Sequence, residues 1–175
     1  FSRQLDFTKF DIIYAGAQKN MGPAGTTLVV IKEEILGKNG REIPSMLDYA
    51  KHIKAESMYN TPPVFPVYAS LLTLQWLKKL GGIAAIEKIN NAKAELLYNE
   101  IDRNPLFKGA AAVEDRSNMN ATFLLNNPEH APIFDTMWKE AGISGLPGHR
   151  SVGGYRASMY NAMPIESVQV LVNVM

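Results

Sequence analysis

Lys19 is the residue whose setting most directly suggests covalent chemistry. It lies in the stretch FDIIYAGAQKNMGPAGTTLVV, residues 10–30, between two apolar runs, with small residues around it and no acid beside it in the sequence. A lysine that is removed from water at the end of a strand has a lowered pKa and can attack a carbonyl to form a Schiff base. The same setting is typical of a surface lysine, so this residue alone leaves both interpretations open. The chain has no G-x-x-x-x-G-K-[ST] pattern, which excludes a Walker-type phosphate loop.

Asn60 and Thr61 form a second candidate site, just before Pro62-Pro63 and a predicted helix. Thr61 is expected to be the N-cap of that helix, with a proline in the first turn. A helix N-terminus with Asn and Thr donors can also hold a phosphate. The capping and phosphate-binding interpretations use the same geometry, so the motif does not decide between them.

His149, Arg150 and Arg156 stand in a third segment, the glycine-rich GHRSVGGYR at residues 148–156. Arginine grips carboxylates and phosphates through paired hydrogen bonds, and glycines let a ligand approach the backbone. An isolated segment of this kind is also typical of a basic surface loop. Three cationic or potentially cationic groups close together, with few acids nearby, favour an anionic ligand.

The composition excludes several classes of function. The 175 residues suffice for one domain, or one and part of another, and the net charge of +1 gives no electrostatic argument for nucleic acid or an anionic membrane as partner. No apolar run approaches the roughly 18 residues that span a bilayer. The absence of cysteine excludes disulfides and thiolate nucleophiles and fits a reducing compartment, so we expect a cytoplasmic protein. His52 and His130 lack metal-ligand spacing, and we expect no metal site.

Strands and helices are expected to alternate around these candidate residues. Apolar runs predict strands at residues 11–14 and 27–32, whose near-continuous Ile, Val and Leu character suits a sheet buried on both faces. Residues 45–63 fit no clear pattern. The other expected elements are a helical turn at 33–36, helices at 64–80, 83–103, 131–141 and 165–175, and strands at 119–125 and 155–159.

The two longest helices are expected to have distinct faces. In the first, helical spacing places four large side chains on one face: Phe65, Tyr68, Leu72 and Trp76. In the second, the spacing directs Ile86, Ile89, Leu97 and Ile101 inward and Glu87, Lys88, Lys93, Glu95 and Glu100 outward. We place a domain boundary near Ile89, which divides the chain into residues 1–88 and 89–175.

Four segments together resemble the phosphoserine aminotransferases, a family of pyridoxal-phosphate enzymes in the class V aminotransferase group. They are YAGAQKNMGPAG at 14–25, PSMLDY at 44–49, SMYNTPP at 57–63 and GHRSVGGYRASMYNAMP at 148–164. The resemblance covers essentially the whole chain and implies the C-terminal part of an α/β, fold-type I pyridoxal-phosphate transferase. Residues 1–88 would be the end of the large cofactor domain, and residues 89–175 the small α+β domain.

The resemblance implies roles around the cofactor. Lys19 would form the Schiff base with pyridoxal phosphate and later shuttle a proton. Gln18 would donate to the cofactor phosphate, and Asn60 and Thr61 would reach the phosphate in the partner's site across a homodimer.

The resemblance also implies how substrates would bind. Arg156 would clamp the substrate α-carboxylate, while His149 and Arg150 would contact the distal anion, which is the phosphate of phosphoserine or the side-chain carboxylate of glutamate. The implied reaction is 3-phosphohydroxypyruvate plus glutamate giving phosphoserine plus 2-oxoglutarate, in serine biosynthesis, and the family also acts on a related substrate in pyridoxine biosynthesis. These partners are small molecules.

The resemblance leaves part of the cofactor site unaccounted for. The family's aspartate for the pyridinium nitrogen, its stacking aromatic residue and its glycine-rich phosphate loop precede the lysine, and residues 1–18 hold none of them in recognisable form. We therefore expect a piece of a longer protein, cut at both ends, and no useful transaminase activity from these 175 residues alone. Two alternatives stay open: a non-catalytic binding or assembly module on the same fold, and an aminotransferase for another dianionic substrate. A cysteine desulfurase is disfavoured, because the chain has no cysteine.

Overall fold

The computed structural model describes residues 2–38 and 40–175, which cluster into two compact units. Residues 3–80 make up the first unit, and Ser2 is grouped with residues 81–175 in the second. The expected domain boundary after residue 88 falls inside one continuous helix, α3, Gly82–Arg103. The division into 1–88 and 89–175 stays a prediction about the longer protein.

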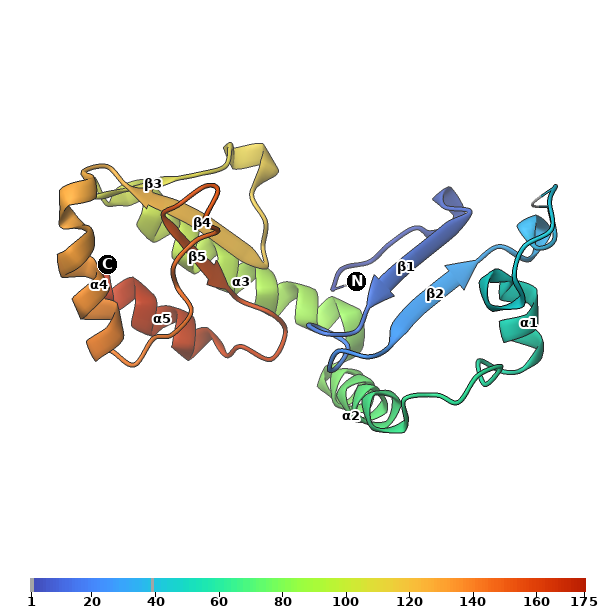
Figure 1. The fold of residues 1–175 in the computed structure, drawn as a ribbon. Helices are drawn as coiled ribbons and strands as arrows, with labels where there is room; N and C mark the ends of the chain where they lie inside the picture. The colour runs from blue at the N-terminus through green and yellow to red at the C-terminus, as the bar shows by residue number, and fades with distance from the viewer. Residues whose placement is uncertain (1, 39) are drawn as a thin grey trace. The chain divides into compact units, whose positions relative to one another are not determined.

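The first unit contains a two-stranded sheet and two helices (Figure 1). The strands run antiparallel, with Ile12 opposite Ile31 and Gly16 opposite Thr27. The expected strands and the longer helix are confirmed, whereas the shorter helix lies in the segment that the sequence left unassigned. The elements are β1 Ile12–Gly16, β2 Thr27–Ile31, α1 Tyr49–Lys54 and α2 Val64–Leu80, with short 3-10 helices at Phe7–Lys9, Glu33–Ile35 and Ser45–Leu47.

The expectation that this sheet is buried on both faces is wrong for this chain. No residue of β1 or β2 is fully buried, and Tyr14 is 73% exposed. The four large side chains expected on one face of α2 are also open to solvent: Phe65 is 74% exposed, and Tyr68, Leu72 and Trp76 are exposed as well. Two strands and one long helix have too little surface to cover one another, so apolar strand composition does not by itself produce a buried sheet.

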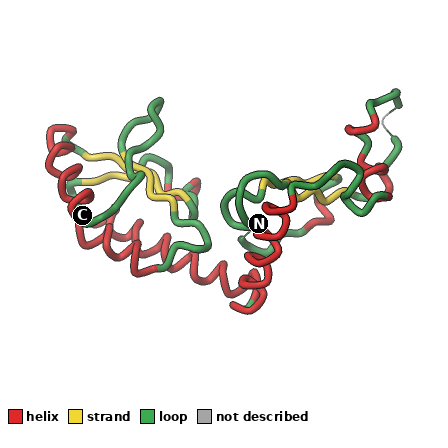
Figure 2. Tube along the Cα trace, turned by 60° about the horizontal axis from the view of Figure 1, so that its bottom comes forward, coloured by secondary structure: helices red, strands yellow, loops and turns green. Residues whose placement is uncertain are grey.

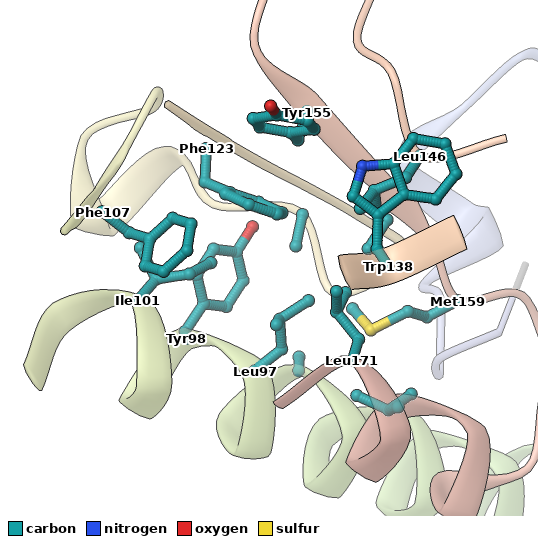
Figure 3. Packing of buried hydrophobic residues seen from close by; sticks show 14 of the residues in the cluster. Leu97, Tyr98, Ile101, Phe107, Phe123, Trp138, Leu146, Tyr155, Met159 and Leu171 are labelled. Atoms are coloured by element: carbon teal, nitrogen blue, oxygen red, sulfur yellow. The ribbon is translucent and has the colours of Figure 1, made fainter. Parts of the chain in front are cut away.

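The second unit packs helices against a three-stranded antiparallel sheet in the order β3-β4-β5. Figure 2 shows its strands side by side, with the long helix α3 running beside them. Leu97 and Ile101 of α3 enter the core with Phe107, Phe123 and Leu171 (Figure 3). The remaining elements are β3 Phe107–Gly109, β4 Asn120–Leu125, α4 Ala131–Glu140, β5 Tyr155–Ser158 and α5 Ile165–Val174, with 3-10 helices at Val113–Asp115 and Pro128–His130.

Two charged residues of α3 that were expected to face outward are buried. The side chain of Lys93 has no exposed surface, and Glu100 is 3% exposed. The Lys93 ammonium donates to the carbonyl oxygens of Met159, Tyr160 and Met163 at 3.1, 2.8 and 3.0 Å. These bonds replace water around the charge, which is the condition for burying it. Burial lowers the pKa of Lys93 from its ordinary value.

The buried charge of Glu100 is also balanced by polar partners. Its Oε1 accepts a hydrogen bond from the side-chain amide of Asn104 at 2.9 Å, and its Oε2 pairs with Arg103. The inward prediction is confirmed for Ile86, Leu97 and Ile101, while Ile89 is half-buried.

Tyr155 anchors the beginning of β5. Its ring stacks on Phe123 and meets Phe134 edge-on, with ring centroids 5.4 and 4.9 Å apart. Its hydroxyl donates to Asp135 at 2.9 Å, and Trp138 donates to the same carboxylate oxygen at 3.0 Å. Burial, with the hydrogen bond to Asp135 second, raises the pKa of Tyr155 to about 12. Because successive strand residues point to opposite faces, this anchor directs the next residue, Arg156, away from the core.

Candidate functional site

The chain reverses direction around Ala17, immediately after β1. The buried Ala17 donates its N–H to the Thr26 carbonyl at 3.0 Å. Its own carbonyl accepts from the amides of Lys19, Met21 and Gly22 at 2.6, 3.2 and 2.9 Å. These bonds hold the turn, while the side chain of Lys19 stays on the outside and exposed.

The lysine turn, residues 17–26, rests on helix α2. A Cβ on Gly22 would lie 3.0 Å from the Ser70 backbone and overlap the Ser70 hydroxyl. Gly25 has φ +117°, and a Cβ there would lie 2.8 Å from the Pro66 ring. The Thr26 hydroxyl oxygen lies 3.4 Å from that of Ser70. The glycines of this turn are therefore needed for close packing against the helix.

Gln18 and Lys19 lie next to each other on the open side of the turn. The amide of Gln18 folds over Gly16, where any Cβ would overlap it, and both Gln18 and Lys19 are exposed. Both side chains are therefore accessible to a ligand on that side of the turn.

Asn60 and Thr61 do not form the expected helix cap. Helix α2 begins at Val64, and its first backbone bond runs from the amide of Val67 to the carbonyl of Pro63 at 3.2 Å. Residues that precede a proline disfavour helical backbone angles, so the helix begins only after the second proline. The prediction that Thr61 is the N-cap of α2 is therefore wrong. Asn60 donates one amide hydrogen to the Thr61 carbonyl at 3.2 Å, and both side chains are exposed.

The anion-loop candidate is a closed loop between Gly148 and Gly154. The amide of Gly148 donates to the Gly154 carbonyl at 2.8 Å, and the His149 carbonyl accepts from the amides of Val152 and Gly153 at 2.9 and 2.7 Å. A Cβ on Gly148 would overlap the Gly153 carbonyl. Glycine at position 148 is thus required for the loop to close.

The loop presents His149 and Arg150 to solvent. The Ser151 amide donates to His149 Nδ1 at 3.3 Å, and the Ser151 hydroxyl lies 2.6 Å from the same nitrogen. An amide N–H can only donate, so Nδ1 is an acceptor and the neutral ring carries its hydrogen on Nε2. That N–H and the Arg150 guanidinium are both suited to hold an anion.

Arg156 lies on β5, on the sheet face opposite the core, and its side chain is exposed. Its N–H donates to the Leu146 carbonyl at 2.7 Å, and its partner across the strands is Thr122. Within residues 2–38 and 40–175, no carboxylate pairs with its guanidinium within 4 Å. The structure thus leaves this cation available to an external anion.

The seven candidate residues divide between the two units. Gln18, Lys19, Asn60 and Thr61 lie in the first, and His149, Arg150 and Arg156 in the second. No group of three or more metal-ligating side chains occurs in the described part of the chain. Across the same residues, no helix has the length and apolar character to cross a membrane.

Two supporting residues escaped the sequence reading. Ser70 carries no motif, because only the close approach of Gly22 reveals its role. Lys93 did carry a signal, since it lies seven residues after Ile86 and four before Leu97, on the buried stripe of α3. It was nevertheless expected to face outward, because a charged side chain is normally exposed to solvent.

Comparison with known proteins defines the class. The family model described as aminotransferase class-V matches residues 1–171, so the chain belongs to the class-V aminotransferase family. It is 85% identical over all of its 175 residues to a phosphoserine aminotransferase of Flavobacterium johnsoniae, of which it covers 49%. The chain therefore spans about half the length of the curated relatives it matches.

Solved structures give the same answer for the fold. The phosphoserine aminotransferase of Bacillus circulans subsp. alkalophilus matches 99% of the chain with a TM-score of 0.92 and 42% identity, and 48% of that protein is covered. A pyridoxal-phosphate-bound phosphoserine aminotransferase from Trichomonas vaginalis matches 99% of the chain with a TM-score of 0.88 and 36% identity, and 50% of that protein is covered. The expected α/β, fold-type I transferase class is confirmed.

Proposed function

We propose that this chain is the C-terminal portion of a phosphoserine aminotransferase. The whole protein would transfer an amino group between glutamate and 3-phosphohydroxypyruvate in the cytoplasm, as a step of serine biosynthesis, and a second phosphorylated substrate in pyridoxine biosynthesis would use the same site. One observation carries the proposal: the match to relatives of that name, at up to 85% identity over all of this chain and about half of theirs, includes an exposed lysine in a preformed turn.

The donor set in the first unit fits pyridoxal phosphate. The aldehyde of this cofactor needs an amine, and its phosphate needs hydrogen-bond donors. Lys19 offers the amine, and the exposed side chains of Gln18, Asn60 and Thr61 offer amide and hydroxyl donors. When bound, the cofactor supplies an electron sink for charge that develops at the substrate α-carbon.

Lys19 would hold the cofactor through its ε-amino group and would move a proton at the substrate α-carbon. The hydrogen bond from its amide to the Ala17 carbonyl fixes the Lys19 backbone within the turn, so that the long side chain extends from a defined position. Gln18 would donate to the cofactor phosphate from the same turn. Asn60 and Thr61 would serve the partner's site in a homodimer.

The ring nitrogen of the cofactor needs an acid that this chain does not offer between residues 2 and 18. Asp6 accepts hydrogen bonds from the amide and hydroxyl of Thr8, and Asp11 pairs with Lys32 at 2.9 Å. Both carboxylates therefore already have partners. For this reason we propose that the 175 residues alone are inactive and that the half of the relatives' length which this chain does not span completes the site.

The cations of the second unit match a substrate with two anionic ends. Arg156 would bind the α-carboxylate, which both substrates share. His149, through Nε2–H, and Arg150 would bind the distal phosphate or carboxylate. Two separated anion sites favour dianionic amino acids over those with neutral side chains.

Borohydride reduction of the full-length protein loaded with pyridoxal phosphate tests the proposal. Mass mapping of the labelled peptide should place the adduct on Lys19, and Lys19→Arg should abolish labelling. Labelling at another lysine would refute the assignment. Arg150→Ala should raise the KM for phosphoserine and glutamate more than for alanine, whereas equal effects on all three would point to another substrate.

A further inference from the structure

The outer face of the second unit's sheet is built to attract anions. Its residues come from all three strands, and two of them are cationic while none is acidic: Lys108, Asn120, Thr122, Leu124, Arg156 and Ser158. The opposite face carries the buried aromatic core, so these side chains point away from it. An anion on this face therefore meets a positive field with no competing carboxylate among the six.

Thr122 is the side chain placed nearest to Arg156 by the strand register. The two residues lie directly opposite each other in the β4–β5 pair. The Arg156 amide donates to the Leu146 carbonyl, and the Thr122 carbonyl accepts from the Ala110 amide. Neither of these backbone hydrogen bonds joins β4 to β5. They thus form a non-hydrogen-bonded pair, in which side chains approach most closely, with Cβ atoms about 4.5–5.5 Å apart.

Asn120 lies one step further along the same face, opposite Ser158. Its Oδ1 accepts from the hydroxyls of Ser158 and Tyr160 at 3.1 and 3.2 Å. Two donors on one oxygen fix the amide plane and leave the Nδ2 hydrogens available as donors. Diagonal neighbours on a sheet lie about 7–8 Å apart, within reach of an arginine side chain.

We infer that Thr122 and Asn120 complete the carboxylate site of Arg156. The Thr122 hydroxyl and the Asn120 amide donate to the carboxylate that the guanidinium grips, and they select a planar carboxylate at this end of the substrate. The inference rests on the role of Arg156 in the proposed function. Motif reasoning did not find these residues, because β4 is joined to Arg156 only through strand pairing.

Three variants of the full-length, cofactor-loaded protein separate a ligand-binding role from a packing role. Thr122→Val keeps the shape and removes the hydroxyl, Thr122→Ser keeps the hydroxyl and removes the methyl, and Asn120→Asp keeps the acceptor for both hydroxyls and replaces the donor. The probe is glutarate, whose binding is measured by titration calorimetry, together with the KM and kcat for glutamate.

We expect Thr122→Val to weaken glutarate binding at least about tenfold, the lower end of the range for one hydrogen bond to a charged group, and Asn120→Asp to weaken it at least as much. The loss should appear in the KM for glutamate more than in kcat. Thr122→Ser should bind glutarate more tightly than Thr122→Val, because serine keeps the hydroxyl that donates to the carboxylate. If Thr122→Val binds glutarate more tightly than Thr122→Ser, or if neither Thr122→Val nor Asn120→Asp weakens binding, the inference is overturned.

Arg156→Lys separates this inference from the proposed function. It keeps the charge but loses the paired hydrogen bonds, and it should weaken glutarate binding. If it does so while Thr122→Val and Asn120→Asp bind like the unmodified protein, the inference fails and the function stands. If Arg156→Lys leaves glutarate binding unchanged, the carboxylate role of Arg156 fails, and the inference falls with it.

Discussion

Replacing Lys93 by methionine tests how the strand that carries Arg156 is held. Methionine has similar length and fills the same space, so the change removes the ammonium without leaving a large cavity. It leaves the carbonyls of Met159, Tyr160 and Met163 without the donor that reaches them from α3. The first two of these carbonyls directly follow β5, which ends at Ser158, and the third lies five residues beyond its end.

The magnitude follows from two opposing terms. Hydrogen bonds to a charged group contribute about 1.5–3 kcal/mol each, so three contribute roughly 4.5–9 kcal/mol. Taking an ammonium out of water costs several kcal/mol, which the methionine variant recovers. The net loss of stability expected for Lys93→Met is about 2–4 kcal/mol.

Urea unfolding of the second unit, followed by the fluorescence of the buried Trp138, measures this loss. Trp76→Phe removes the tryptophan of the first unit, and Lys88→Met, an exposed position on the same helix, is the matched control. The control should change the free energy of unfolding by less than about 0.5 kcal/mol. If Lys93→Met were as stable as Lys88→Met, the carbonyl bonds would not stabilise the unit, and the reasoning would be refuted.

The remaining predictions concern pH and packing. The pKa of Tyr155 is raised to about 12 from an ordinary 10.0, so the neutral hydroxyl stabilises the folded state fully below pH 10 and this stabilisation is lost as pH rises through 12. Tyr155→Phe should therefore reduce the loss of stability at alkaline pH in urea titrations. The hydrogen bond from Arg116 lowers the pKa of Asp102, so in Arg116→Leu the carboxyl should titrate at a higher pH by NMR, and an unchanged titration would contradict the pairing. Gly22→Ala should destabilise the first unit by about 1–3 kcal/mol, measured through Trp76 fluorescence, and Ser70→Ala should recover part of that loss.

Local signals predicted many of the elements and some of their ends. Helix α2 has the predicted bounds, because two prolines precede its first residue and Gly81-Gly82, both at positive φ, follow its last. The strand β3 was missed, since three residues are too few to show alternation. The lysine turn was also marked locally, by its glycines.

The partners of these local elements could not be predicted in the same way. Lys93 was expected in water, yet the carbonyls that bind it come from residues 66–70 positions away in the chain. The apolar strands β1 and β2 were expected to be buried, yet they remain open, because burial depends on what packs over a strand. Thr61 had the residue type of a cap but not the position, since Pro62 and Pro63 delay the helix.

The sequence by itself determined the chemical groups: the amine of Lys19, the imidazole of His149, the guanidinium groups of Arg150 and Arg156, and the glycines that allow their turns. Residue type and backbone preference are local properties, so short motifs contain them in full. Only the tertiary structure decided that Ser70 supports the lysine turn, that Lys93 is buried, and that Thr122 and Asn120 lie beside Arg156. Strand register and helix packing bring together residues that are far apart in the chain. Their contacts form only when the whole unit folds, so no single segment of the sequence contains the information that specifies them.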